Sequence, residues 1–229
     1  MKRFYKNAEA APGEGGVAIL LDGRPVKTPA RNPLSAPTEE LAEAIAAEWN
    51  DQSEDIDPRT MPLTGLANAA IDRVAPDPAA FAAVLAAYGE SDLLCYRSEG
   101  PGELVRRQHD AWDPLLLWAR RRYDIKLETV CGVMHIPQPQ ETVERLARAV
   151  AARGLFQLAA LSPLVTISGS LVVALALAEG EIPLDAAWAA ATLDEAWQAE
   201  QWGEDALAVQ ALELRRREFE AAYRFLTLL

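Results

Sequence analysis

The sequence holds little of the chemistry from which common active sites are built. Its 229 residues include two histidines, His109 and His135, and two cysteines, Cys95 and Cys131. Neither pair has the spacing of a zinc site or of a redox dithiol, so no metal site is expected and both cysteines are predicted to be reduced. The nucleophile elbow, the dinucleotide-binding glycine turn and the P-loop are also missing. We therefore predict a protein that is not an enzyme and that needs no cofactor.

Positive charge is also scarce. Lysine and arginine number 22 against 34 acidic residues, which gives a formal net charge of −12. A protein that binds along nucleic-acid phosphates needs a basic face, so no nucleic-acid partner is expected.

The uncharged run over residues 164–178 is shorter than the ~20 residues that span a membrane, so no membrane insertion is expected. Met1 leads directly into Phe4 and Tyr5 without a leader pattern, which predicts a bacterial cytoplasmic protein.

The first part of the chain has the pattern of strands. Val17, Ile19 and Leu21 alternate with smaller residues before Asp22-Gly23, a strong signal for a two-residue hairpin turn. A further strand is expected over residues 3–6. We predict a small antiparallel β domain over residues 1–34. The basic residues that follow the turn, Arg24 and Lys27, are interpreted as charges that protect a sheet edge, with a partner contact as the alternative.

After Pro33 the hydrophobic period changes to that of helices. We predict a mainly α-helical domain over residues 35–229, which makes the fold α+β. Pro114 is expected to kink or restart its helix. Helices are expected over residues 38–52, 63–74, 78–88, 103–124, 141–153 and 205–229. Residues 126–135 show weak β character, and residues 91–97 are left unassigned.

The stretch from Ser162 to Asp205 is expected to organise the helical domain. Ser162-Pro163 is a helix-start signal, and the uncharged run that follows is typical of a helix buried on all sides. Gly169-Ser170 is interpreted as a pair of small residues inside this helix. A second, amphipathic run is expected over residues 184–202.

The end of this stretch gathers acidic and aromatic residues, in a pattern open to two interpretations. Trp202, followed by Glu204 and Asp205, could form a surface that receives a partner, or its tryptophans could be core and its acids solvated. The pairs Asp194/Glu195 and Glu204/Asp205 also keep open an enzyme that uses carboxylates near Glu195. Trp112, Trp118 and Trp197 are assigned to the core.

Several short motifs in order along the chain resemble one known family, the assembly chaperone for the α subunit of the F-type ATP synthase catalytic head. Each motif is weak alone, but their order and spacing are specific. The matching pieces are Arg3-Phe4-Tyr5-Lys6, residues 21–29, Ala47-Glu48-Trp49 with Gln52, residues 61–64, residues 92–97, Gln108 with Trp112-Asp113-Pro114, and residues 193–203.

The resemblance implies a non-catalytic chaperone with a small N-terminal β domain and a larger helical domain. It implies that the partner is the unassembled α subunit, shielded until the β subunit takes over, and that the chain itself binds no ATP. Relatives in eukaryotes would be mitochondrial. We hypothesise that Glu195, Trp202 and Asp205 form the client-binding face. A general protein-interaction module remains the other non-enzymatic alternative.

Overall fold

The Asp22-Gly23 hairpin forms as the sequence predicts. The structure is a computed structural model that describes residues 1–13, 15–203 and 205–229. Asp22 and Gly23 have φ values of 48° and 76°, the left-handed conformation that a primed turn requires at both positions. The turn joins strand β2 (Gly16–Leu21) to the short strand β3 (Arg24–Pro25).

The sheet has two strands that the pattern did not reveal and lacks one that was expected. Strand β1 (Ala8–Gly13) pairs antiparallel with β2, and the two-residue β4 (Ser35–Ala36) pairs with β2 as well. The strand predicted over residues 3–6 is wrong, because these residues form no strand, and a single bridge joins the preceding Lys2 to Asp55. The side chain of Arg3 binds the carbonyls of Asn50 and Lys6 instead and anchors an irregular segment.

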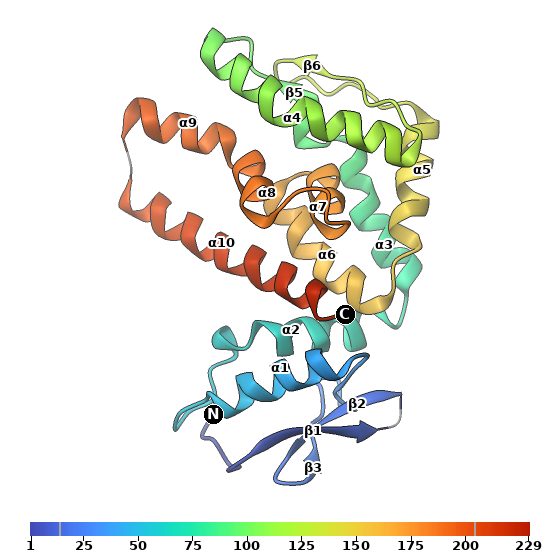
Figure 1. Cartoon of the computed structure of the whole chain (residues 1–229), viewed down its shortest axis with the longest axis vertical. Helices are drawn as coiled ribbons and strands as arrows, with labels where there is room; N and C mark the ends of the chain where they lie inside the picture. The colour runs from blue at the N-terminus through green and yellow to red at the C-terminus, as the bar shows by residue number, and fades with distance from the viewer. Residues whose placement is uncertain (14, 204) are drawn as a thin grey trace. The chain divides into compact units, whose positions relative to one another are not determined.

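The fold is α+β, as predicted, with a small antiparallel sheet and a mostly helical remainder (Figure 1). The chain divides into two compact units. The sheet unit comprises residues 1–78, 154–160 and 221–229, and the helical unit comprises residues 79–153 and 161–220. The domain boundary placed after residue 34 stays a prediction.

Helix α1 (Glu39–Asn50) covers the sheet and is the amphipathic helix expected from the sequence. The Thr38 side chain caps it by accepting a hydrogen bond from the Leu41 amide. Leu41 and Ile45 are fully buried in the core of the sheet unit. Glu48 on the same helix accepts hydrogen bonds from the amides of Leu63 and Thr64, at 2.7 and 2.8 Å, and so caps helix α2 (Pro62–Ala69).

The helices after α2 are joined by turns, some of them 3-10 or π helix, and by two longer segments, residues 87–101 and 124–139, on either side of α4. A two-stranded parallel pair, β5 (Tyr96–Arg97) with β6 (Val130–Cys131), is the strand structure found where β character was weak. Among the described residues, no helix is long and apolar enough to cross a membrane. The helices are α3 (Pro78–Ala86), α4 (Gly102–Tyr123), α5 (Gln140–Ala151), α6 (Leu155–Ser168), α7 (Leu171–Ala178), α8 (Leu184–Ala191), α9 (Leu193–Trp202) and α10 (Ala206–Thr227).

The helix boundaries expected near two prolines differ from the prediction. Pro163 starts no helix but lies inside α6, which ends where Gly169 adopts a φ of 65°. Ser170 then caps α7 by accepting a hydrogen bond from the Val173 amide. Gly169 and Ser170 therefore end one helix and begin the next. Helix α4 continues through Pro114 as one helix, so of the two predicted effects of this proline the restart does not occur, and the kink stays a prediction.

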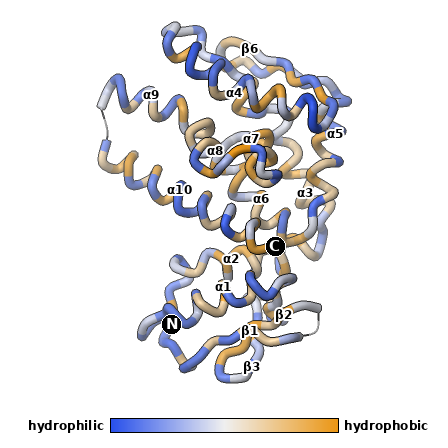
Figure 2. Tube along the Cα trace, in the orientation of Figure 1, coloured by the Kyte–Doolittle hydropathy of each residue, from blue (hydrophilic) through white to orange (hydrophobic). Residues whose placement is uncertain are grey.

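Helix α7 is buried along seven consecutive residues, which confirms the expectation of a helix buried on all sides. Helix α10 differs from it, because hydrophobic and hydrophilic residues alternate along its length (Figure 2). The N-terminus of α7 is hydrogen-bonded to Asp92, a carboxylate with no exposed surface. Asp92 accepts hydrogen bonds from the Ser170 hydroxyl at 2.7 Å and from the amides of Val172 and Leu94 at 2.9 and 3.0 Å. The acid thus joins α7 to the segment of residues 92–97 that the sequence left unassigned.

The C-terminus of α7 is held by a second carboxylate, Glu179, which is partly buried. Burial by itself raises the pKa of Glu179, but hydrogen bonds from Arg122, Tyr123 and Arg153 outweigh it and hold the pKa below the usual range. The ion pairs with Arg122 and Arg153 keep the glutamate ionised while its side chain is only 15% exposed.

Replacing Glu179 by Gln is expected to lower the free energy of unfolding by about 1–2 kcal/mol at neutral pH, because hydrogen bonds to a charged acceptor are lost. Since the folded-state pKa is depressed, this contribution is full above the ordinary glutamate pKa of about 4.3 and is lost as the pH falls through the folded-state value. Urea unfolding curves of the two proteins should therefore differ at neutral pH and converge in acid. A difference in the free energy of unfolding between the two proteins that persists at low pH would contradict the depressed pKa assigned to Glu179.

Candidate functional site

The three residues of the predicted client-binding face line a single groove in the helical unit. Helices α9 and α10 form a helical hairpin (Figure 1), and a cavity of about 760 Å³ lies between them. Glu195 and Trp202 contribute from α9, and Asp205 lies just before α10. The rest of the lining is largely apolar or uncharged and is provided by Ala196, Gln198, Ala199, Gly203, Ala208, Val209, Ala211 and Leu212, with Glu200 and Arg215 as further charged members.

Trp202 is the exposed aromatic side chain of this groove. It is 79% exposed at the last position of α9, whereas Trp197, one turn earlier, is buried. Trp197 therefore has the core position of one interpretation, and the exposed Trp202 is compatible with the other, a surface that receives a partner, which stays a prediction. Trp112 is also buried and donates a hydrogen bond to the Ala190 carbonyl, and Trp118 is half-buried.

The two acids of the predicted face have different surroundings. Glu195 forms an ion pair with Arg215, which joins α9 to α10 across the groove. Both side chains remain partly open to solvent, with exposed fractions of 48% and 38%. Asp205 accepts long hydrogen bonds, at 3.4 Å, from the amides of Leu207 and Ala208 at the start of α10. Glu204, the other half of the predicted Glu204/Asp205 pair, lies outside the described residues.

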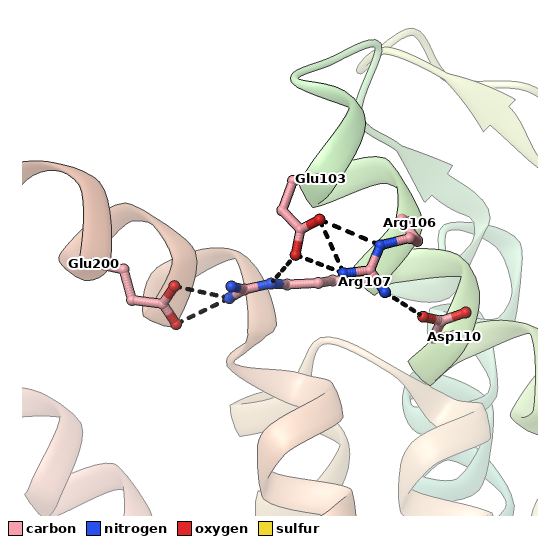
Figure 3. Close-up of polar contacts among 5 residues, drawn as sticks. All are labelled: Glu103, Arg106, Arg107, Asp110 and Glu200. Carbon is pink, nitrogen blue, oxygen red and sulfur yellow. Dashed lines mark hydrogen bonds and ion pairs between the residues drawn. The ribbon is translucent and has the colours of Figure 1, made fainter.

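On its other side, α9 is attached to α4 by polar contacts (Figure 3). Nη1 of Arg107 donates to both carboxylate oxygens of Glu200, at 2.9 and 2.8 Å. The same guanidinium lies over the Trp197 ring, 4.8 Å from its centre, and Nε2 of Gln108 donates to Asp194 at 2.8 Å. No local pattern in the sequence points to Arg107, because its partner Glu200 lies 93 positions away.

A second groove opens on the α4 side of α9. It has a volume of about 740 Å³ and is lined mostly by apolar side chains of α4, α8 and α9, including Leu115, Trp188 and Leu193. Ala196 lines both grooves, so α9 forms the wall between them.

The neighbouring acids Asp194 and Glu195 do not form a carboxylate pair. Asp194 and Glu195 are neighbours in the sequence, yet Asp194 pairs with Gln108 of α4 and Glu195 with Arg215 of α10. They do not converge on one point, as paired acid–base carboxylates must. Within the described ranges, no group of three or more histidine, cysteine or acidic residues could hold a metal ion. Apolar walls with charged groups at the rim are typical of a surface that binds protein.

The chain is similar in sequence and fold to known chaperones. The sequence profile of the family described as ATP12 chaperone protein matches residues 2–120. The crystal structure of Atp12 from Paracoccus denitrificans superposes on 99% of this chain and 97% of its own, with 44% identity and a TM-score of 0.95. A mutant of that protein gives 43% identity and a TM-score of 0.94 over the same shares of the two chains.

A mitochondrial relative is also similar over most of its length. The atp12 protein of Schizosaccharomyces pombe is 28% identical over 94% of this chain and 79% of its own. The chain belongs to the ATP12 chaperone family, in agreement with the resemblance found in its motifs. This membership fits a chaperone for ATP synthase assembly.

Proposed function

We propose that the protein binds the unassembled α subunit of the F1 sector and shields its subunit interface until the β subunit takes over. An α subunit without its neighbours exposes apolar surface, and large exposed apolar patches drive aggregation. The family membership supports the chaperone role. The observation that supports the place of binding is the groove in which Glu195, Trp202 and Asp205 meet.

On this proposal, the chemistry of the groove favours one kind of client segment. Its floor is made of small and aliphatic side chains of α9 and α10, and Trp202 stands exposed at one end. A large exposed aromatic residue beside an apolar depression is the usual composition of a binding hot spot. Glu195 and Asp205 add negative charge at the rim, so the preferred client segment is apolar with basic residues at its edge.

The same surface suits a chaperone that must release its client. The groove is open to solvent, and its charged members are partly hydrated, with Glu195 48% and Glu200 50% exposed. Charge pairs at such a rim mainly steer association and contribute little to affinity. A β subunit that covers the α interface more completely can therefore displace this protein. Its place of action in the bacterial cytoplasm remains a prediction.

Replacing Glu195 by Lys is expected to weaken capture of the α subunit about tenfold, because the rim then repels the basic edge of the client. The fold should persist, since the lost pair with Arg215 is partly exposed and contributes at most about 1 kcal/mol. The measurement is titration of purified α subunit with the wild-type protein and the variant, together with a thermal melt of each.

The matched control is Glu213→Lys on α10. It makes the same change of charge on an exposed residue that does not line the groove, and it should leave capture unchanged. The double variant Glu195→Lys with Arg215→Glu restores an ion pair between α9 and α10 but still presents lysine to the client, so its capture should stay weak. Equal loss in the Glu195→Lys and Glu213→Lys proteins would show that net charge alone is responsible.

A further inference from the structure

Helix α9 is a wall of the proposed site that buries little of its own surface. Among its described residues, only Trp197 is buried, while Glu195, Gln198 and Trp202 face solvent. A helix with so small a buried face depends on its polar contacts to keep its position. The contacts to α4 come from Arg107 and Gln108, and the contact to α10 comes from Arg215.

Arg107 makes more contacts with α9 than either of the other two residues. Its Nη1 reaches both oxygens of Glu200, and its guanidinium covers the ring of Trp197, which is the buried anchor of α9. Its Nε also donates to Glu103, one turn earlier on α4, at 3.2 Å, which orients the side chain toward α9 (Figure 3). Arg107 lines the second groove, while Glu200 lines the first.

We propose that Arg107 is a positioning residue of the client-binding groove. It contacts no client itself but fixes the α9 wall against α4 through Glu200 and Trp197, so that Glu195 and Trp202 are presented at the correct separation from α10. This inference rests on the proposed function for its effect on client capture. Its effect on α9 itself is independent of any client.

Arg106 supplies a matched control next to it in the sequence. Its guanidinium binds Glu103, at 2.7 and 2.9 Å, and Asp110, at 3.3 Å, and both partners belong to α4 (Figure 3). Arg106→Glu and Arg107→Glu therefore change the net charge equally, on the same helix, and each removes a pair with Glu103. Only the second removes a contact with α9.

The test uses the full chain and two readouts. In Arg107→Glu, which sets a third acid beside Glu103 and Glu200, amide hydrogen exchange in α9 should accelerate about tenfold, and the dissociation constant for purified α subunit should rise about tenfold. Arg106→Glu should change both by less than about twofold. Arg107→Lys keeps the charge but not the planar group over Trp197. Its amide exchange in α9 and its dissociation constant should therefore lie between those of Arg106→Glu and Arg107→Glu.

Charge exchange then separates positioning from a general loss of structure. The double variant Arg107→Glu with Glu200→Arg re-forms an α4–α9 ion pair with the two charges exchanged, and should return amide hydrogen exchange in α9 to within about threefold of wild type. Amide exchange alone is the readout for this variant, because Glu200 itself lines the client groove. The proposal is overturned if Arg106→Glu is as damaging as Arg107→Glu, if the exchanged pair restores nothing, or if Arg107→Glu leaves α9 protected. If the wild-type protein binds no α subunit, the proposed function fails, while amide exchange still decides the role of Arg107.

Discussion

Replacing Trp202 by Ala is expected to weaken capture of the ATP synthase α subunit by about 2 kcal/mol, or about thirtyfold in dissociation constant. The side chain is 79% exposed in the free protein, so its apolar surface is available for burial against a client. It stands at the end of α9, beside a groove whose walls are largely apolar. Titration of purified α subunit measures the effect, and the melting temperature should not fall, because the indole supports little of the fold.

Two further variants make this result specific. Trp202→Phe keeps an aromatic ring and should retain most of the affinity. Leu214→Ala removes another exposed apolar side chain of the helical unit, one that is 59% exposed and does not line the groove. It should bind the client as the wild-type protein does. Equal capture by the Trp202→Ala and wild-type proteins would place the client elsewhere on the surface.

Replacing Asp92 by Ala is expected to lower the free energy of unfolding by about 3–4 kcal/mol, the largest effect on stability that we predict. The change leaves the buried amides of Val172 and Leu94 and the hydroxyl of Ser170 without their acceptor. It also removes the support for the start of α7, whose residues are buried almost throughout. Asp92→Asn should lower the free energy of unfolding nearly as much. The NH2 group of asparagine is a donor, and it would face one of these donors in place of an acceptor oxygen.

Urea unfolding followed by tryptophan fluorescence measures this effect well, since five of the six tryptophans lie in the helical unit. Asp185→Ala is the matched control. Asp185 is 84% exposed and makes a surface ion pair with Arg216, so its loss should cost less than about 1 kcal/mol. A cost below about 1 kcal/mol for Asp92→Ala would contradict the role given to this carboxylate.

Local signals in the sequence predicted much of the fold. The Asp22-Gly23 turn and the stripe of Leu41 and Ile45 each depend on residues close together in the chain, and both form as expected. An error arises where a residue typical of a helix start lies close to residues that determine the helix boundary more strongly. Pro163 resembles a helix start, yet the chain breaks at Gly169, where a positive φ is available and Ser170 can cap the next helix.

The residues of the candidate site could be predicted in part, because several of them lie close together in the sequence. Glu195, Trp202 and Asp205 lie within about three turns of chain, so an acid–aromatic pattern could be seen before the groove was known. The opposite wall, with Leu212 and Arg215, required the pairing of α9 with α10. Arg107 could not be found at all, since the residue it holds is 93 positions away and no local pattern connects them.

The most direct test of the account is affinity capture from the native organism, with the bound protein identified by mass and the Trp202→Ala variant captured in parallel. The account predicts that the wild-type chain retains the ATP synthase α subunit free of the β subunit, and that Trp202→Ala retains much less of it. Recovery of a different protein as the main partner, or of the α subunit in equal amounts with both chains, would contradict it.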